Sequence, residues 1–318
     1  MDFQPTEDQQ DLRAGVRDLL EGRYGREALR ASVDSGTAVD RGLWRELGAA
    51  GFFALRLPES EGGVGLGLPE AVLVFEEAGR ALVPGPLVAT HLAAGVVPGA
   101  AAGTAVVTAF DLGGGLVAHL GEADAVLGAD GLPDGEPVRA ADPLTPLHRV
   151  RRRAGAAAPG DGSAYGSAHR SAYGSTCVSE GALLTAALQV GSALRTVELA
   201  VRYAGEREQF GQPIGAFQAV KHLCAQMLVR AEVARTAVYA AAVTGEPGEV
   251  AAAKLLADEA AVLGARDCLQ VYGGMGFTWE ADVHLHLKRA WVRAEQWRTA
   301  AEAEELLAAE LLDSPDTR

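Results

Sequence analysis

The most informative sequence in this chain is RYAGEREQFGQPIGAFQAVKH, residues 202–222. It indicates the end of one helix, a turn built on glycine and proline, and the start of another helix. A second stretch, QVYGGMGFTWE at 270–280, indicates a helix that runs into paired glycines. Both lie in an alanine-rich half of the chain, so they predict corners where the long helices of a bundle are joined.

Four helices are predicted around these corners, at about 179–203, from 217 onward, at 250–272 and at about 283–312. Ser179 is the expected N-cap of the first helix. The second helix carries apolar residues at helical spacing along one face: Val220, Leu223, Met227, Ala231, Ala234 and Val238. Long helices with short connections favour an up-and-down bundle, so residues 178–318 are predicted to form a C-terminal four-helix bundle.

The first hundred residues predict an N-terminal helical domain spanning 1–102. Thr6 and Gln9 form a capping-box pattern at the start of its first helix, and further helices are expected at about 44–50 and 70–82. Between these lies LPESEGGVGLG at 57–67. It has no GK[ST] sequence and follows no strand, so it predicts a turn-rich loop whose glycines permit positive φ, rather than a phosphate-binding loop.

The residue pattern changes after residue 103. TAVVTAF (104–110), GLVAHL (115–120) and DAVLGA (124–129) are short apolar runs rich in β-branched residues, and they predict a shortened β-domain over 103–160. Residues 161–177 repeat SAYGS and have almost no aliphatic side chains, which predicts a flexible linker. The predicted fold class is therefore mainly α with a small β insert.

Composition excludes some classes of function. The net charge of −14 argues against nucleic acid or an anionic membrane as the main partner, although a local arginine cluster can still bind a phosphate-bearing cofactor. The sequence has no run of eighteen apolar residues, so no membrane-spanning segment is predicted. The N-terminus lacks the pattern of a signal peptide. Cys177, Cys224 and Cys268 lie far apart, so buried free thiols in a reducing cytoplasm are expected.

Several residues at the two corners have the chemistry to hold a nucleotide. Arg207 can donate a planar pair of hydrogen bonds to a phosphate, although its place at a helix C-terminus also explains it electrostatically. Gln218 and Gln270 can hydrogen-bond the edges of a nucleotide, and Gly273 and Gly274 let a ligand approach the backbone closely. Residue chemistry alone leaves a nucleotide site and a plain helix corner both open.

Neither of two other polar clusters on the last predicted helix is predicted to form a binding site. His284 and His286, near Asp282, are two positions apart, so on a helix their side chains diverge and no metal site is predicted. A basic run on the same helix is expected to be a salt-bridged surface, and it comprises Lys288, Arg289, Arg293 and Arg298.

The same stretches resemble a known family. REQFGQPIGAFQ followed by QVYGGMGF is similar to the C-terminal sequence of acyl-CoA dehydrogenases, and WRELGAAGF, LPESEGGVGLG and EEAGRAL resemble that family's first helical domain. The resemblance covers about 1–100 and 178–290. It implies the family fold and FAD bound at a subunit interface. The residues it implies in contact with the ADP part of a neighbour's FAD are Arg207, Gln218, Gln270, Gly273 and Gly274, with Phe210 packed in the same region.

The chain also departs from the family pattern. The T-E-P…G-S-D loop and W-I-T-[NS] strand that wrap the flavin ring are absent from the sequence. Counting from the matched motifs, the family's two alternative positions for the catalytic glutamate fall at Trp297 and Gly181. Glu180 and Glu295 lie one and two residues away, and solvated carboxylates explain both better than a base, so no catalytic residue is expected, with Glu180 as a weak candidate.

This pattern resembles the short subunits of actinobacterial α2β2 acyl-CoA dehydrogenases. The resemblance implies a longer partner subunit that supplies the ring-binding loop and the glutamate, an acyl-CoA substrate with a steroid side chain, and an electron-transfer flavoprotein or similar acceptor. Arg298, beside the lost glutamate position, could then face the partner's active site. Two alternatives stay open: a homo-oligomeric dehydrogenase that uses Glu180, and a non-catalytic scaffold subunit.

Overall fold

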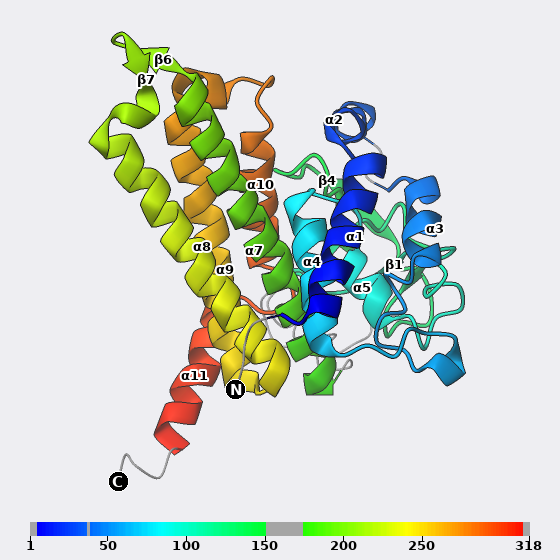
Figure 1. Ribbon diagram of the computed structural model, residues 1–318. Coiled ribbons are helices and arrows are strands. Elements are labelled where there is room, and N and C mark those ends of the chain that lie inside the picture. Colours follow the sequence, from blue (N-terminus) through cyan, green and yellow to red (C-terminus); the bar gives the residue numbers. More distant parts are fainter. Residues whose placement is uncertain (1–4, 37–38, 151–173, 314–318) are drawn as a thin grey trace.

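The protein is described by a computed structural model that covers residues 5–36, 39–150 and 174–313. Long helices of the C-terminal half run side by side, and the N-terminal helices and the small β region pack along one flank of them (Figure 1). The observed architecture is mainly helical with a small β insert, as predicted.

The N-terminal region contains α1 (Glu7–Arg23), α2 (Arg26–Ser35), α3 (Arg41–Ala49), α4 (Leu68–Arg80) and α5 (Leu87–Leu92). The capping box that opens α1 is confirmed, because the Gln9 backbone N–H donates to Thr6 Oγ1 at 3.3 Å and the Thr6 N–H donates to Gln9 Oε1 at 3.0 Å. The predicted loop is confirmed too. It contains the short helix η1 (Glu59–Glu61), and Gly62 and Gly65 adopt positive φ. Helices α2 and α5 were not predicted.

The β region forms two small sheets. Strands β1 (Val107–Thr108) and β3 (Ala125–Val126) pair in parallel, whereas β5 (Leu147–Val150) lies between β2 (Leu116–Ala118) and β4 (Gly135–Val138) in an antiparallel sheet. The shortened β-domain is confirmed by these strands of two to four residues. β4 and β5 add two strands that the apolar runs did not indicate.

The C-terminal bundle contains α7 (Gly174–Glu206), α8 (Gln218–Thr244), α9 (Pro247–Tyr272), α10 (Val283–Ala294) and α11 (Ala300–Asp313). Helix α7 lies at the centre, in contact with α4, α8 and α9. The predicted apolar face of α8 is confirmed, with Met227 and Val238 among its buried residues.

Three sequence predictions about the bundle are corrected. Helix α7 begins at Gly174, so Ser179 lies inside it and the end of the predicted linker is helical. The rest of that linker, and the first SAYGS repeat, lie outside the described residues. The expected single helix at 283–312 is broken into α10 and α11 around Trp297, which has a positive φ of 63°. By length and composition α7 could also span a membrane, but 72% of its apolar window is buried in the protein.

Glycine holds the N-terminal helices close to the bundle. A Cβ on Gly79 of α4 would lie 2.1 Å from the Leu188 carbonyl oxygen of α7, and a Cβ on Gly191 would lie 1.8 Å from the Glu76 carbonyl oxygen. Only residues without a Cβ allow α4 and α7 to cross at this distance. The two parts of the chain therefore pack as one unit around a shared core.

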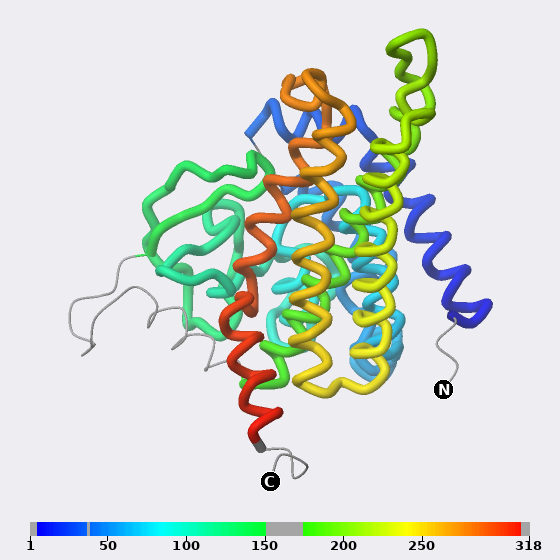
Figure 2. The backbone as a smooth tube through the Cα atoms, turned by 90° about the vertical axis from the view of Figure 1, so that its left-hand side faces the viewer, coloured from blue at the N-terminus to red at the C-terminus, as the bar shows by residue number. Residues whose placement is uncertain are grey.

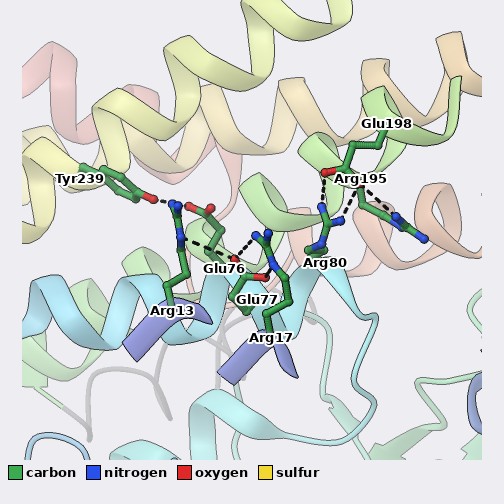
Figure 3. A network of polar contacts seen from close by, with 8 residues as sticks. All are labelled: Arg13, Arg17, Glu76, Glu77, Arg80, Arg195, Glu198 and Tyr239. Atoms are coloured by element: carbon green, nitrogen blue, oxygen red, sulfur yellow. Dashed lines mark hydrogen bonds and ion pairs between the residues drawn. The ribbon is translucent and has the colours of Figure 1, made fainter. Parts of the chain in front are cut away.

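A polar network borders the same crossing (Figure 3). The Arg17 guanidinium donates two hydrogen bonds to the Glu77 carboxylate, at 2.6 and 2.8 Å, and the Tyr239 hydroxyl donates to Glu76 Oε2 at 2.7 Å. Burial raises the pKa of Glu76, whereas its hydrogen bond from Tyr239 favours the charged form. These contacts join α1, α4 and α8 and fix the N-terminal helices relative to the bundle.

Candidate cofactor site and the two base positions

A hairpin projects from one end of the bundle, between α7 and α8 (Figures 1 and 2). Its strands are β6 (Glu208–Gln209) and β7 (Gln212–Pro213), joined by a turn in which Phe210 and Gly211 both have positive φ. The Ile214 backbone N–H closes the hairpin on the Arg207 carbonyl at 2.7 Å. The predicted turn of glycine and proline is thus a built element that holds Arg207 at its base.

Arg207 ends helix α7, where its backbone N–H donates to the Tyr203 carbonyl at 2.8 Å. Its side chain is exposed, and its guanidinium makes no hydrogen bond or ion pair with any described residue. Phe210, at the tip of the hairpin, is 92% exposed and touches only the edge of Phe217 among aromatic rings, at a centroid distance of 6.0 Å. A cation and an aromatic ring therefore stand free beside one tight turn.

The second corner is equally open. Helix α9 ends at Tyr272, and Gly273 follows with φ 58° and ψ −137°, a conformation that favours glycine. A Cβ on Gly273 or on Gly274 would meet no atom within 4 Å, so the backbone is accessible from outside. Gln270 is exposed on the last turn of α9. The short helix η3 (Gly273–Phe277) continues the chain.

Ring stacking places the two corners at the same end of the bundle. Tyr203 of α7 and Tyr272 of α9 stack with their centroids 4.1 Å apart and their planes 13° apart. Gln218 is exposed as the first residue of α8, at the same end. The structure therefore gathers all six predicted cofactor-binding residues on one end of the molecule, and none of them is buried.

A cleft of about 500 Å³ opens next to this end, between α1, α2 and the bundle. Tyr203, Tyr272 and Met275 line it, so it reaches the residues on both sides of Gly273 and Gly274. Arg202 and Arg195 add positive charge to the same wall. No local motif indicated this cleft, because its two walls come from segments far apart in the chain.

The two positions where the family's glutamate was expected lie in contact with each other. A Cβ on Gly181 would fall 2.3 Å from the indole ring of Trp297. Trp297 is only 1% exposed, and its backbone N–H donates to the Asp111 carbonyl at 2.8 Å. A rigid aromatic ring therefore fills the space at this corner, in a backbone conformation that tryptophan seldom adopts.

Glu180 lies beside this corner and is engaged elsewhere. Its carboxylate forms an ion pair with Arg56, and its Oε1 lies 3.8 Å from His91 Nε2. Burial lowers the pKa of His91 to about 4, so Arg56 is the charged partner of Glu180 at neutral pH. Glu295 is exposed just after α10, where its backbone N–H donates to Val292. Neither carboxylate lines the cleft of about 500 Å³ or the small cavity beside Trp297.

The prediction of a salt-bridged basic surface is corrected. Arg289 and Arg293 of α10, and Arg298 just after it, are buried, and Arg289 forms an ion pair with the fully buried Asp142. Only Lys288 remains partly exposed, where its ammonium lies over the Trp279 ring. The spacing could have indicated this, because Leu285, Arg289 and Arg293 recur every four residues and therefore lie on one face of the helix.

The two histidines of α10 make separate contacts. His286 is buried and shares a hydrogen bond of 2.7 Å with the Ser192 hydroxyl, whereas the His284 ring stacks on Trp279. No cluster of three or more potential metal ligands occurs among the described residues. The three cysteines are free, and Cys268 is buried as predicted, but Cys177 and Cys224 are only partly buried.

Comparison with known proteins identifies the family. A family profile described as "Acyl-CoA dehydrogenase, C-terminal domain" matches residues 172–301, and the "Acyl-CoA dehydrogenase, N-terminal domain" profile matches 6–109. Acyl-CoA dehydrogenase IpdE2 of Mycobacterium tuberculosis (strain ATCC 25618 / H37Rv) is 35% identical, over 98% of this chain and 99% of its own. This chain belongs to the acyl-CoA dehydrogenase family.

Solved structures agree on the fold. A chain of the ChsE4–ChsE5 complex from Mycobacterium tuberculosis matches this dehydrogenase chain with a TM-score of 0.80 and 25% identity, over 99% of this chain and 100% of its own. A variant of the Tcur3481–Tcur3483 steroid ACAD matches with a TM-score of 0.78 and 23% identity, over 97% and 99%. FAD is the cofactor of acyl-CoA dehydrogenases.

The residues of this acyl-CoA dehydrogenase chain fit one half of FAD. The exposed Arg207 guanidinium and the open backbone at Gly273 and Gly274 suit a pyrophosphate, since both can donate hydrogen bonds without first breaking others. The loops expected around the flavin ring are absent from the sequence, and Trp297 fills the corner to which the family's two glutamate positions were counted.

Proposed function

We propose that this chain is the helper subunit of a hetero-oligomeric acyl-CoA dehydrogenase. It contacts the ADP part of FAD, and a longer partner subunit supplies the flavin-ring loop and the catalytic glutamate. The substrate is an acyl-CoA thioester with a bulky, steroid-like side chain, and an electron-transfer flavoprotein or similar acceptor reoxidises the flavin. Free thiols and the acidic surface suit the cytoplasm.

The contact between Trp297 and Gly181 carries the proposal. Dehydrogenation removes a proton from Cα of the thioester while the β-hydrogen leaves with its electron pair, so a carboxylate must lie over Cα. FAD, when bound, accepts that hydride. Here both positions that place the carboxylate in the family are occupied by groups that cannot accept a proton, and they fill each other's space. This supports a base that comes from another chain.

The exposed end of the bundle supports the same division. Arg207, Gln218 and Gln270 point away from the protein's own core and lack partners within the described residues. Donors left in water cost nothing in the free chain, and they become useful when a second subunit presents a phosphate-bearing ligand. Contacts to a cofactor held mainly by a neighbour explain why this end is open.

The substrate class is supported by one likeness. The steroid ACAD named above shares the fold over nearly the whole chain. The shortened β-domain leaves more room at a subunit interface for a polycyclic acyl group than a full one would. Within this chain, the cavity beside Trp297 measures only about 30 Å³, which is too small for any acyl chain.

Co-expression tests the proposal. The full chain is purified alone and together with a longer acyl-CoA dehydrogenase subunit of the same organism, and FAD is measured per chain together with oxidation of a steroid side-chain CoA thioester. We expect a colourless or poorly soluble chain alone, and a yellow, active complex of equimolar subunits.

Each alternative has its own outcome in this experiment. A homo-oligomer that is saturated with FAD and active without a partner would support the use of Glu180 as base and overturn the proposal. If the partner subunit binds the same amount of FAD with and without this chain, the result would support a scaffold role. Trp297→Phe, which replaces the indole with a smaller phenyl ring, should leave activity of the complex unchanged and serves as a control for the filled corner.

A further inference from the structure

The cleft of about 500 Å³ beside the exposed end of the bundle contains groups that the proposed function does not use. Its deeper wall is apolar, and Leu20, Leu29, Leu82 and Leu199 of this wall are all buried. Pockets for small molecules have volumes of about 300–1,000 Å³ and are mostly apolar, with a few polar groups that fix the ligand. The cleft therefore has the size and the apolar lining of a ligand site, and its charged groups indicate the class of ligand.

Helix α7 presents two arginines to the cleft from one face. Arg195, Leu199 and Arg202 all line the cleft, and their spacing of four and three residues places them on the same side of the helix. Arg195 and Arg202 are two turns apart, or about 10 Å along the helix axis. The cleft thus has two cationic positions on one wall, with an apolar side chain between them.

Arg195 belongs to a group in which arginines outnumber carboxylates. Arg80 of α4 binds both oxygens of Glu198, and Arg195 Nη1 donates to Glu198 Oε2 at 3.0 Å (Figure 3). One carboxylate therefore serves two guanidinium groups, and one positive charge is left over. Arg17, which also lines the cleft, engages both oxygens of Glu77. The oxygens of both carboxylates are thus engaged, whereas each arginine keeps N–H donors that no described residue uses.

Arg202 supplies a second positive charge. It forms no ion pair with a described residue, and its side chain is exposed. Burial raises the pKa of the Tyr272 hydroxyl, and the nearby charge of Arg202 opposes that shift, so the two side chains lie close together. The stacked rings of Tyr203 and Tyr272 therefore form an aromatic wall with a guanidinium beside it.

The other carboxylates of the cleft repel an anion only weakly. Asp282 forms ion pairs with both Arg26 and Arg30 of α2, so it too is outnumbered. Glu21 and Glu280 are exposed, and water and salt screen their charge. The wall formed by α4 and α7 is therefore the cationic side of the cleft, in a protein whose net charge is −14.

We propose that the cleft binds a phosphate monoester with a planar aromatic body, a ligand of the size of a nucleoside monophosphate. The phosphate contacts Arg80 and Arg195. A tetrahedral phosphate offers three oxygens to guanidinium groups that come from different helices, whereas a planar carboxylate offers two in one plane. The aromatic body lies two turns further along α7, against Tyr203 and Tyr272, and the Arg202 guanidinium covers its face.

This site is distinct from the cofactor site at the exposed end of the bundle. None of the six residues assigned to FAD lines the cleft. The bound ligand joins α4 to α7, and its binding does not depend on which subunit supplies the flavin-ring loop or the catalytic base.

Calorimetry with three probes separates the parts of the ligand. AMP carries a phosphate monoester and an aromatic base, adenosine lacks the phosphate, and inorganic phosphate lacks the base. The protein is titrated as the FAD-saturated complex or, if the chain binds no partner, as the full chain alone, so this test is independent of the proposed subunit role. We expect AMP to bind at least about tenfold more tightly than either other probe.

Three outcomes of this titration overturn the proposal or one of its parts. Failure of AMP to bind, or displacement of FAD by AMP as measured by flavin absorbance, overturns the separate site. Equal affinities for AMP and adenosine overturn the phosphate position. Equal affinities for AMP and inorganic phosphate overturn the place of the aromatic body.

Arg195→Gln tests the phosphate position. It should weaken AMP binding about ten- to a hundredfold, the effect of a lost hydrogen bond to a charged group, and leave adenosine binding unchanged. An arginine with only a structural role would change both alike. Arg235→Gln is the matched control, because Arg235 also pairs with a glutamate three residues away, at a side-chain exposure of 31% against 34%, but does not line the cleft. It should bind AMP as the wild type does.

A second variant keeps the test valid if Arg195→Gln does not fold. Arg202→Gln changes an exposed side chain and should weaken AMP and adenosine alike, by about two- to fivefold, because it removes the guanidinium from the face of the aromatic body. AMP affinity that is unchanged in both cleft variants, or that falls equally in Arg235→Gln, contradicts the proposal.

Discussion

The exposed end of the bundle and the corner at Trp297 use glycine in opposite ways. At Gly273 and Gly274 the missing side chain leaves open space, with no atom within 4 Å of either Cβ position. At Gly181 the missing side chain makes room for the Trp297 indole, which lies 2.3 Å from the Cβ position. The backbone is therefore accessible at Gly273 and Gly274 and covered by a side chain at Gly181.

The difference follows from what each region contacts. An exposed donor without a partner, such as Arg207, can form a contact without breaking an internal hydrogen bond. An empty cavity lined by core residues lowers stability, and at Gly181 the Trp297 indole fills the space that would otherwise be empty.

The largest expected effect tests the filled corner. Gly181→Ala places a methyl group inside the Trp297 ring, and overpacking against a rigid side chain should reduce the free energy of unfolding by about 3 kcal/mol. The matched control is Gly205→Ala in the same helix, whose Cβ would meet no atom within 4 Å. That change should be neutral or stabilising, by up to about 1 kcal/mol. Urea unfolding of both variants measures the difference, and equal stabilities would show that the corner is not filled as described.

The second prediction tests the open end. Arg207→Ala should weaken FAD retention in the assembled complex by about 1.5–3 kcal/mol, the value of a hydrogen bond to a charged group. Arg207→Lys should recover only part of the loss, because an ammonium cannot make a planar bidentate contact. Flavin absorbance per complex after gel filtration is the measurement. Unchanged flavin content in Arg207→Ala would mean that this arginine only ends its helix.

These two regions were not equally visible in the sequence. The open end could be predicted, because each of its residues lies in a short local motif such as QFGQPIGAFQ or QVYGG. Local motifs specify turns and helix ends directly, and the structure places all of these residues together. The positions of the missing base could also be counted from the same motifs, to Gly181 and Trp297.

The filled corner could not be predicted, because it depends on contacts between distant segments. Nothing local to Trp297 shows that its ring meets Gly181, more than a hundred residues earlier in the chain. The buried arginines of α10 were misassigned for the same reason. Charged residues are usually exposed, and the carboxylate that stabilises Arg289 comes from Asp142 in the β region. The break between α10 and α11 likewise needs tertiary support for the positive φ at Trp297.

The third prediction is that acid lowers the stability of the protein through the buried His286. Burial lowers the pKa of His286 to about 3, below its ordinary value of 6.5. Between these values the unfolded chain binds a proton that the folded chain does not, so stability falls as the pH falls. At pH 5 this one histidine should cost about 2 kcal/mol of unfolding free energy. His286→Gln should flatten the pH dependence, measured by urea unfolding from pH 7 to 5. The exposed His222 offers the control, since His222→Gln should leave the slope unchanged.

The smallest expected effect tests whether a carboxylate beside the filled corner acts as the catalytic base. Glu180 is the carboxylate nearest to the filled corner, but its charge is paired with Arg56 and its neighbour Gly181 is covered by Trp297. If it is structural, Glu180→Gln should leave turnover of the assembled complex within about threefold, or under 0.7 kcal/mol. Glu295→Gln is the matched change at an exposed carboxylate and should behave alike. Loss of a true base costs at least about 10²–10⁴-fold, with substrate binding largely intact. A hundredfold loss in Glu180→Gln, at unchanged FAD content and assembly, would therefore place the base in this chain and make the covered corner part of an active site. The reason is that only a carboxylate that reaches Cα can produce a loss of that size without weakening substrate binding.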